Sequence, residues 1–179
     1  MQGRDIGLPA FNGETNQAGA AAIGARLRRL SERIDRDAGR LYAEAGIDFE
    51  QRWFGVINLL ALLGPRTVGE LASFLGVSHA SVSQVRAALE RAELTIWNEH
   101  PGDRRQRRLQ LSAKGENLVA RLTPLWKALI TAALEINEEA DDALAALERL
   151  ETVLSRVSLY SRVKLIMDGN TADIAAVRP

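Results

Sequence analysis

Apolar residues recur every three or four positions through most of the chain, the spacing that places them on one face of a helix. Long helices are predicted at 20–45, 49–63, 113–137 and 141–167, and two shorter ones on either side of Gly76. Only residues 94–99 and 107–111 have the composition of strands. The pattern therefore predicts a mainly α protein with one small β-hairpin.

The long helices differ in how much of their surface is apolar. Helix 49–63, which Asp48 can cap, is apolar on most sides and is expected to lie at the centre of the fold. The other long helices each have one apolar stripe. The stripes of the last two have no obvious partner within residues 65–112. The stripes consist of Ile23, Leu27, Leu30, Ile34, Ala38 and Leu41; of Leu118, Leu122, Leu125, Leu129 and Ile136; and of Leu144, Leu147, Leu150, Leu154 and Val157.

The residues before Gly76 indicate a short helix that ends in a sharp turn. Leu71, Phe74 and Leu75 are expected to form its inner face. Gly76 permits a left-handed turn because it has no Cβ, and Val77 is expected to be buried directly after it.

A second short helix follows, with Ser78 as a good N-cap and Val82, Val85 and Leu89 on its buried face. Small and amide side chains occupy the opposite face and its flanks. Such a face can enter the major groove of DNA and bond to base edges or phosphates, whereas a helical hairpin packed on a neighbour is the alternative. The residues concerned are His79, Ala80, Ser81, Ser83, Gln84 and Ala87.

The predicted hairpin is rich in arginine at its end. The turn sequence 100–103 separates the strands, and Arg104, Arg105, Arg107 and Arg108 crowd beside it. These guanidinium groups repel one another unless a negative partner meets them, and a phosphate backbone or a narrow minor groove supplies that charge. A solvated cluster is the alternative, but the position directly behind a helix-turn-helix favours DNA contact.

These motifs resemble the multiple-antibiotic-resistance regulator (MarR) family of winged helix-turn-helix repressors. The resemblance is carried by Glu70-Leu71-Ala72, Ser78-x-x-Ser81-Val82-Ser83, Leu89-Glu90, Asp103-x-Arg105 and Leu111-Ser112-x-x-Gly115. It implies that Asp103 braces the wing, that Arg105 reaches the minor groove and that residues 78–84 face the major groove. It also implies that the first and last helices interlock with those of a second subunit.

Two positions depart from the family pattern. Glu93 stands where a glycine usually ends the recognition helix, so the turn there is expected to have a different shape, because a left-handed cap costs more without glycine. Gln84 stands where arginine is common, which exchanges a charged contact for an amide one.

Composition excludes or disfavours several other functions. The chain has no cysteine and two histidines, so disulfides and thiol redox sensing are excluded and a histidine-rich metal site is disfavoured. It has no nucleophile motif, phosphate loop or metal-spaced cluster, and we expect neither enzymatic activity nor a cofactor. Without a signal peptide or a bilayer-spanning stretch, it is expected to be cytoplasmic and to bind no membrane.

Charge is distributed unevenly although the formal net charge is zero. Residues 65–115 have more basic than acidic side chains, and residues 116–154 have the reverse. Residues 65–115 would thus be attracted to DNA and residues 116–154 repelled, which would orient the protein as it binds DNA.

We expect a disordered arm at 1–19, a helical dimerisation region at 20–64 and 113–167, a winged helix-turn-helix domain at 65–112 and a flexible tail at 168–179. A homodimer would present two recognition helices about one turn of DNA apart, as reading a palindrome requires. A monomer whose terminal helices fold back on themselves is the alternative.

The leading hypothesis is therefore a homodimeric, sequence-specific transcriptional regulator, a repressor, that binds double-stranded DNA. A protein-interaction module that uses the winged-helix lobe is the alternative. The DNA-binding candidates are Ser78, His79, Ala80, Ser81, Ser83, Gln84, Arg104, Arg105 and Arg107.

The resemblance also implies release of DNA by a small aromatic or anionic effector. Arg52, Trp53 and Phe54 are the ligand-binding candidates. Arg52 is the better candidate because an arginine beside a helix start favours an anion, whereas an aromatic residue on an apolar helix face is more often core.

Overall fold

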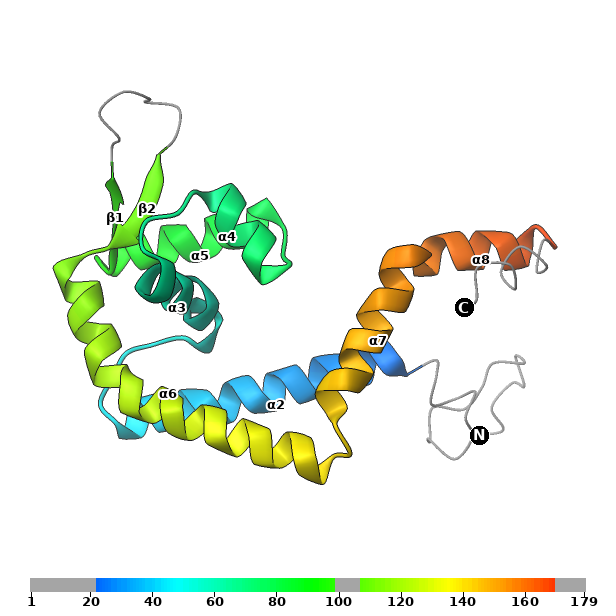
Figure 1. Cartoon of the computed structure of the whole chain (residues 1–179), viewed down its shortest axis with the longest axis horizontal. Coiled ribbons are helices and arrows are strands. Elements are labelled where there is room, and N and C mark those ends of the chain that lie inside the picture. The colour runs from blue at the N-terminus through cyan, green and yellow to red at the C-terminus, as the bar shows by residue number, and fades with distance from the viewer. Residues whose placement is uncertain (1–21, 99–106, 170–179) are drawn as a thin grey trace, which may run out of the picture. The chain divides into compact units, whose positions relative to one another are not determined.

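The computed structural model describes residues 22–98 and 107–169, which form helices and one two-stranded antiparallel hairpin (Figure 1). The mainly α winged helix-turn-helix fold is confirmed. The expected N-terminal arm and most of the expected tail lie outside the described residues. The elements are α2 (Ile23–Glu44), η1 (Gln51–Trp53), α3 (Phe54–Leu63), α4 (Val68–Leu75), α5 (His79–Arg91), β1 (Thr95–Asn98), β2 (Arg108–Leu111), α6 (Ala113–Glu139), α7 (Ala143–Arg156) and α8 (Leu159–Met167).

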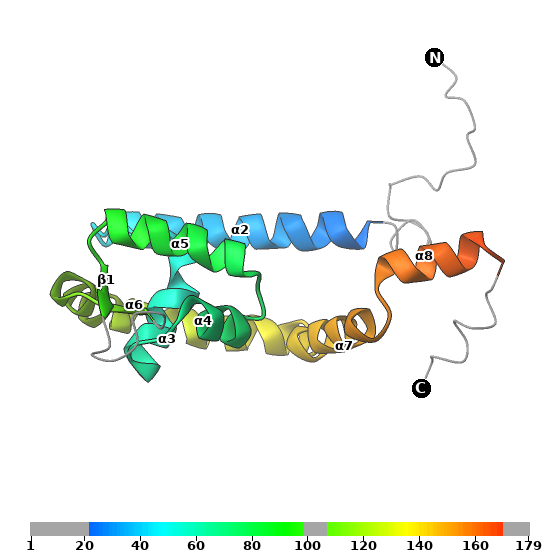
Figure 2. The same cartoon turned by 90° about the horizontal axis from the view of Figure 1, so that it is seen from above.

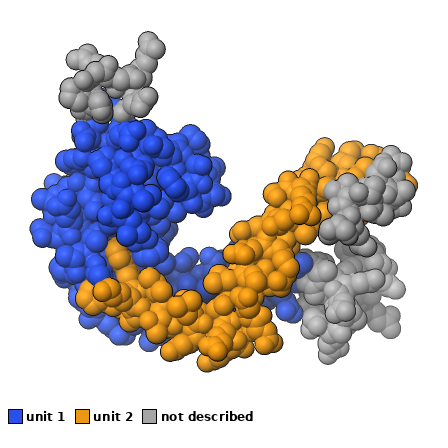
Figure 3. Space-filling model, viewed as in Figure 1, with its two compact units in different colours: residues 1–123 blue, residues 124–179 orange. Residues whose placement is uncertain are grey.

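Two compact units divide the chain at Pro124, within α6 (Figure 3). The first unit contains α2, the helix-turn-helix, the hairpin and the start of α6. The second contains the rest of α6 with α7 and α8, and neither α7 nor α8 has a buried residue. The apolar rows of α7 and α8 are therefore not buried.

The core of the first unit is built around α3, which confirms its predicted central position. Ile57 of α3, Leu71 of α4, Leu89 of α5 and Leu109 of β2 are all fully buried. Figures 1 and 2 show α4 and α5 side by side, with α3 next to them and the hairpin extending away. Burial of these side chains from four elements fixes the recognition helix relative to the wing.

The hairpin pairs Thr95 with Leu111 and Trp97 with Leu109. Arg66, in the linker between α3 and α4, forms an isolated antiparallel bridge with Leu109 of the hairpin. The sequence did not predict this pairing. The N–H of Arg66 donates to the carbonyl of Leu109 at 3.0 Å, and the N–H of Leu109 donates to the carbonyl of Arg66 at 2.7 Å. This bridge ties the base of the wing to the start of the helix-turn-helix.

Two expectations about the first helix of the helix-turn-helix were wrong. Phe74 is 61% exposed, because Ala72 and Leu75 lie on one side of Leu71 around the helix and Phe74 lies on the other. Val77 is also exposed. Its N–H bonds to the carbonyl of Ala72 at 3.1 Å, so the backbone holds the turn without burying the side chain.

The start of the central helix and the end of the chain also differ from expectation. Asp48 does not cap the central helix, because its first turn is the 3₁₀ helix η1, which has no side-chain cap. The single final helix is wrong as well: Val157 is extended and separates α7 from α8. Ser158 accepts the N–H of Ser161 at 3.1 Å and so starts a new helix.

The turn after the recognition helix keeps a left-handed shape although it lacks glycine. Glu93 has φ 61°, and the N–H of Leu94 bonds to the carbonyl of Leu89 at 2.9 Å, as in a Schellman motif. The expectation of a differently shaped turn was therefore wrong. The conformation is held from outside, because the Ser112 hydroxyl donates to the carbonyl of Glu93 at 2.6 Å and Lys114 pairs with its carboxylate at 3.1 Å.

Gly115 packs against the same turn, which explains the Leu-Ser-x-x-Gly motif physically. The Ser112 hydroxyl accepts the N–H of Gly115 at 3.0 Å, and the Ser112 N–H donates to the carbonyl of Leu94 at 3.0 Å. A Cβ on Gly115 would overlap that carbonyl oxygen. Only glycine therefore lets α6 begin against the end of the recognition helix.

Replacing Gly115 with alanine should destabilise the protein by about 1–3 kcal/mol, because the added methyl group meets backbone that cannot move aside cheaply. Urea unfolding measures the effect. The control is Gly24→Ala in α2, where an added Cβ meets nothing within 4 Å. That change should be neutral or slightly stabilising, because alanine is the better helix former. Equal effects of the two substitutions would contradict the packing described here.

Candidate nucleic-acid interface

Three local signals form the helix-turn-helix. Thr67 caps α4 in a capping box, in which Thr67 Oγ1 accepts the N–H of Glu70 at 3.1 Å and Glu70 Oε2 accepts the N–H of Thr67 at 2.7 Å. Gly76 ends α4 with φ 64°. Ser78 then caps α5, as predicted, by accepting the N–H of Ser81 at 3.1 Å. α4 thus begins and ends, and α5 begins, at residues suited to those positions.

The recognition helix α5 buries one face and exposes the other. Val82, Ala88 and Leu89 are buried against the core, while Val85 is half-buried. Most of the sequence-predicted DNA-binding residues are exposed in the first half of α5 or at its cap, and Ser83 is half-buried. The exposed ones are Ser78, His79, Ala80, Ser81 and Gln84.

Two of these side chains are already engaged within the motif. The hydroxyls of Ser78 and Ser81 lie 2.8 Å apart and share a hydrogen bond, so Ser81 also supports the helix start. The His79 ring lies beside the start of α4, where a Cβ on Gly69 would come within 3.3 Å of its Cε1 atom. Gly69 therefore leaves room for the imidazole.

The wing arginines fall into different environments. Arg104 and Arg105 lie outside the described residues. Arg107 is exposed, and its guanidinium carbon lies 5.9 Å from the centroid of the Trp97 ring. Arg108 turns toward the body of the domain, where its Nη2 atom lies 3.8 Å from Glu70 Oε1. Of the two described arginines, only Arg107 retains the exposed position expected of a DNA-binding residue.

The pKa of the Glu70 carboxyl is clearly perturbed. The hydrogen bond from the backbone N–H of Thr67 is the main cause that lowers the pKa of the Glu70 carboxyl below its ordinary value. The Thr67 hydroxyl, Arg108 and Arg66 act in the same direction, and desolvation acts against them. The charged carboxylate thus stabilises the start of α4 and holds an arginine at the base of the wing.

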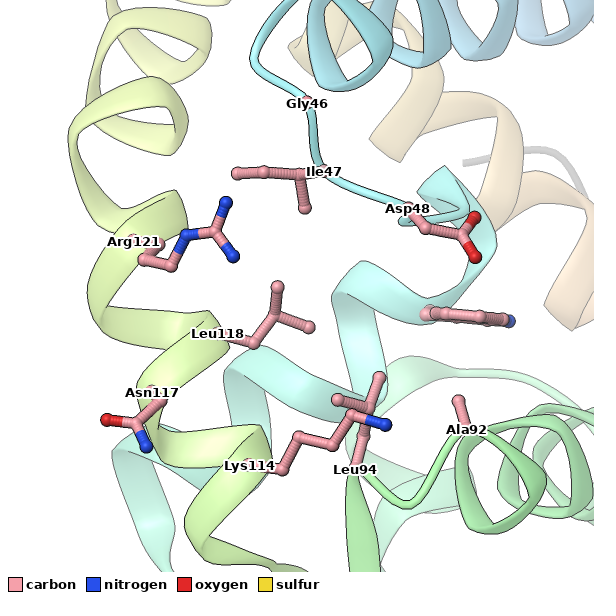
Figure 4. A pocket seen from close by; sticks show the side chains of 10 residues that line it. Gly46, Ile47, Asp48, Ala92, Leu94, Lys114, Asn117, Leu118 and Arg121 are labelled. Atoms are coloured by element: carbon pink, nitrogen blue, oxygen red, sulfur yellow. The ribbon is translucent and has the colours of Figure 1, made fainter.

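A cavity of about 590 Å³ lies where the end of the recognition helix meets the start of α6 and the loop after α2 (Figure 4). Ile47 and Leu118 point into it and form apolar walls. Arg121 directs its guanidinium toward the same space, and Lys114 lines it beside Leu94. Asp48 also lines the cavity, so its wall combines apolar side chains with two basic groups and one acidic group.

The three sequence-predicted ligand residues do not come together there. Arg52 is exposed and pairs with Glu50 at 2.7 Å, and neither it nor the half-buried Phe54 lines the cavity. Trp53 does line it, and is also a core residue whose ring packs edge-on against Phe49 at 5.7 Å.

Sequence reasoning missed the two cations of the cavity. Lys114 and Arg121 stand seven residues apart in α6, with Leu118 between them, which is the spacing of one helix face. That spacing was the available signal.

Within the described ranges, no group of three or more acidic or histidine side chains could hold a metal ion. In the same part of the chain, no helix is long and apolar enough to span a bilayer.

Comparison with known proteins gives a family match for part of the chain. Residues 46–106 match the sequence model of the MarR family. None of the curated proteins matches the chain.

Solved structures of MarR family regulators share the fold. The MarR/EmrR family regulator from Acinetobacter sp. ADP1 is 20% identical with a TM-score of 0.63, and the match covers 77% of this chain and 98% of that one. The transcriptional repressor CouR, bound to a 23-mer DNA duplex, is 25% identical with a TM-score of 0.59, covering 82% and 98%.

A third structure concerns BpsR from Bordetella bronchiseptica, whose DNA binding is regulated by 6-hydroxynicotinic acid. It is 20% identical with a TM-score of 0.60, covering 81% of this chain and 98% of that one.

The lowered pKa of Glu70 predicts a pH dependence of stability. A carboxyl whose pKa is lowered on folding stabilises the folded state above its unfolded pKa, and the contribution is lost as pH falls through the folded pKa. The wild type should therefore lose more stability than Glu70→Gln below pH 4.5, the ordinary carboxyl value. Because the Glu70 side chain is 38% exposed, the difference should stay below about 1 kcal/mol.

Thermal unfolding from about pH 6 down to about pH 3 measures this difference. Glutamine is a suitable comparison because it can still accept the Thr67 N–H in a capping box. Parallel pH profiles of the two proteins would show that the charge of Glu70 contributes nothing.

Proposed function

We propose that this member of the MarR family of transcriptional regulators is a repressor that acts as a homodimer on a palindromic operator. The observation that carries the proposal is the exposed, uncharged first half of α5 beside an arginine-bearing wing. That combination suits base reading by the helix and charge neutralisation by the wing.

Two kinds of DNA contact are expected. Ser78, the first residues of α5 and Gln84 offer short polar groups to base edges and phosphates in the major groove. Arg107 and the neighbouring Arg104 and Arg105 supply charge to the backbone or the minor groove. In support, a repressor that is 25% identical to this chain is bound to a DNA duplex.

A second copy of the chain would cover the unpartnered apolar faces. On α2, Leu30 and Ile34 are 57% and 64% exposed, although they belong to a continuous apolar stripe. Stripes of this length on exposed helices are typical of interfaces rather than of solvated surfaces. Further exposed apolar residues of the second unit are Ile130, Leu134, Leu144, Leu147, Val153 and Leu154.

A small anionic ligand with an apolar body would fit the cavity in the first unit. Its acidic group would pair with Arg121 and Lys114, and its apolar part would contact Ile47 and Leu118. Regulation of a related protein by an aromatic acid supports this choice of ligand class.

The position of the cavity suggests how such a ligand would release DNA. Ala92 and Leu94, at the end of the recognition helix, form part of the wall, and Lys114 pairs with Glu93 in the same turn. An anion that draws Lys114 away would weaken one support of the left-handed turn. We expect α5 to change its orientation when this support is lost, and a ligand that favours the changed orientation would lower the affinity for DNA.

The DNA-binding proposal predicts affinity for the chain's own promoter that falls steeply with salt, as counterion release requires. Arg105→Ala should weaken binding to all sequences by about 1–3 kcal/mol. Gln84→Ala should instead change which bases are preferred. Electrophoretic mobility shifts measure both effects, and DNA fragments selected by the protein should contain half-sites about one helical turn apart.

Absence of duplex binding at any salt concentration would refute the proposal and favour a protein-docking role for the winged lobe. Unchanged binding by Arg105→Ala would show that the wing does not contact DNA.

The effector proposal predicts that aromatic carboxylates raise the melting temperature, because a ligand that binds only the folded state stabilises it. Arg121→Gln should abolish the shift. Arg52→Gln is the matched control, since Arg52 is exposed and does not line the cavity. Loss of the shift in Arg52→Gln alone would place the ligand at the start of the central helix, and no shift with any aromatic acid would contradict this mode of control.

A further inference from the structure

Trp97 occupies an uncommon position at the base of the wing. It stands opposite Leu109 in the hairpin, and cross-strand partners share one face of a sheet. Leu109 is fully buried, so this face packs toward the domain, yet Trp97 remains half-buried. The indole therefore lies at the edge of the core, where one part of it can contact charged side chains.

Two arginines from different elements contact this ring. The guanidinium carbon of Arg86, in the recognition helix, lies 5.4 Å from the ring centroid. That of Arg107, directly before β2, lies 5.9 Å from it. Both distances are within the range of cation–π attraction, for which tryptophan is the strongest aromatic partner.

Arg86 is itself held in place. Its Nη1 atom donates to both carboxylate oxygens of Glu90, at 3.1 and 2.9 Å. Glu90 stands one turn further along α5, so the pair is internal to the recognition helix. The carboxylate offsets the charge of Arg86, and a second guanidinium can therefore approach the same indole with less repulsion.

We propose that Trp97 is a positioning residue for DNA binding, which holds the Arg107 guanidinium and the base of the wing against the recognition helix through its ring contacts with Arg86 and Arg107. The proposal rests on the DNA-binding function proposed above. It assigns Trp97 no contact with DNA.

The geometry of the hairpin explains why the contacts of the Trp97 ring would help DNA binding. Among the described residues, the hairpin has four residue pairs, and one isolated bridge, at Arg66, joins it to another part of the backbone. Backbone pairing sets the distance between the two strands, but it does not fix the direction of the Arg107 side chain. The contact of the Trp97 ring with Arg86 fixes the direction of the Arg107 side chain relative to the recognition helix α5. The Arg107 side chain therefore loses less conformational freedom when DNA binds.

The test compares DNA affinity in a double-mutant cycle of Trp97→Leu and Arg107→Met. Leucine keeps an apolar side chain at the edge of the core and removes the π system. The control is Ile96→Thr, which changes an exposed residue on the other face of the same strand. Trp97→Phe is the conservative variant. Each protein is titrated with operator duplex at several salt concentrations, and its melting temperature is measured.

Trp97→Leu should weaken operator binding roughly three- to ten-fold, the size expected for loss of a cation–π contact. Its melting temperature should stay close to that of the wild type. In the Arg107→Met background the same substitution should have a clearly smaller effect, because only the ring contact with Arg86 is left to be lost. Trp97→Phe should recover most of the affinity, and Ile96→Thr should bind like the wild type.

Additive losses in the cycle, or full affinity of Trp97→Leu, would overturn the proposal, and so would a loss of affinity that merely follows a lower melting temperature. A DNA-free measurement separates this failure from failure of the proposed function. The Trp97 indole N–H resonance, assigned with Trp97→Phe, should shift in Arg107→Met and remain unchanged in Ile96→Thr. If the wild type binds no operator but this shift occurs, the ring contact is present and the DNA-binding proposal fails; if the shift is absent, the positioning role fails.

Discussion

The turn between the recognition helix and the wing constrains the whole first unit. Glu93 is held left-handed there without glycine, at a cost of about 1–2 kcal/mol for an ordinary residue. The cost is offset by groups that come from the start of α6. The Ser112 hydroxyl binds the carbonyl of Glu93 and the N–H of Gly115, and Lys114 pairs with the Glu93 carboxylate. Recognition helix, hairpin and α6 are therefore joined at one hydrogen-bonded junction, and none of them can reorient without breaking it.

The same junction forms a wall of the cavity. Leu94 and Lys114 contribute to both, so a molecule in the cavity touches groups that hold the recognition helix. An exposed ion pair such as that of Lys114 with Glu93 is a weak support by itself, worth up to about 1 kcal/mol. The turn that it supports is strained, however, so even a weak support contributes to its conformation. Effector control in this chain would thus act through a small free energy applied at a strained position.

Much of the fold could be predicted from the sequence because helix stripes, caps and turn residues are local signals. Ser78 and Gly76 marked the helix-turn-helix, and alternating residues marked the hairpin. The errors have two causes, which are local signals that were misjudged, as at Phe74 and Ser158, and tertiary contacts that the sequence did not show, as at Glu93. An apolar stripe continues across Ser158, so its capping role was hidden, and Glu93 looked unsuited to a left-handed turn until its partners from α6 were known. The cavity cations Lys114 and Arg121 could have been found from their shared helix face.

The arginines of the winged unit differ in role although they look alike in sequence. Arg108 turns inward to Glu70 and Pro65, and there it stabilises the base of the wing. Arg86 is neutralised by Glu90 and lies on the Trp97 ring. Arg107 contacts that ring while remaining exposed. Of these three arginines, the half-buried Arg86 and Arg108 each have a carboxylate within 4 Å, whereas Arg107 lies at the surface.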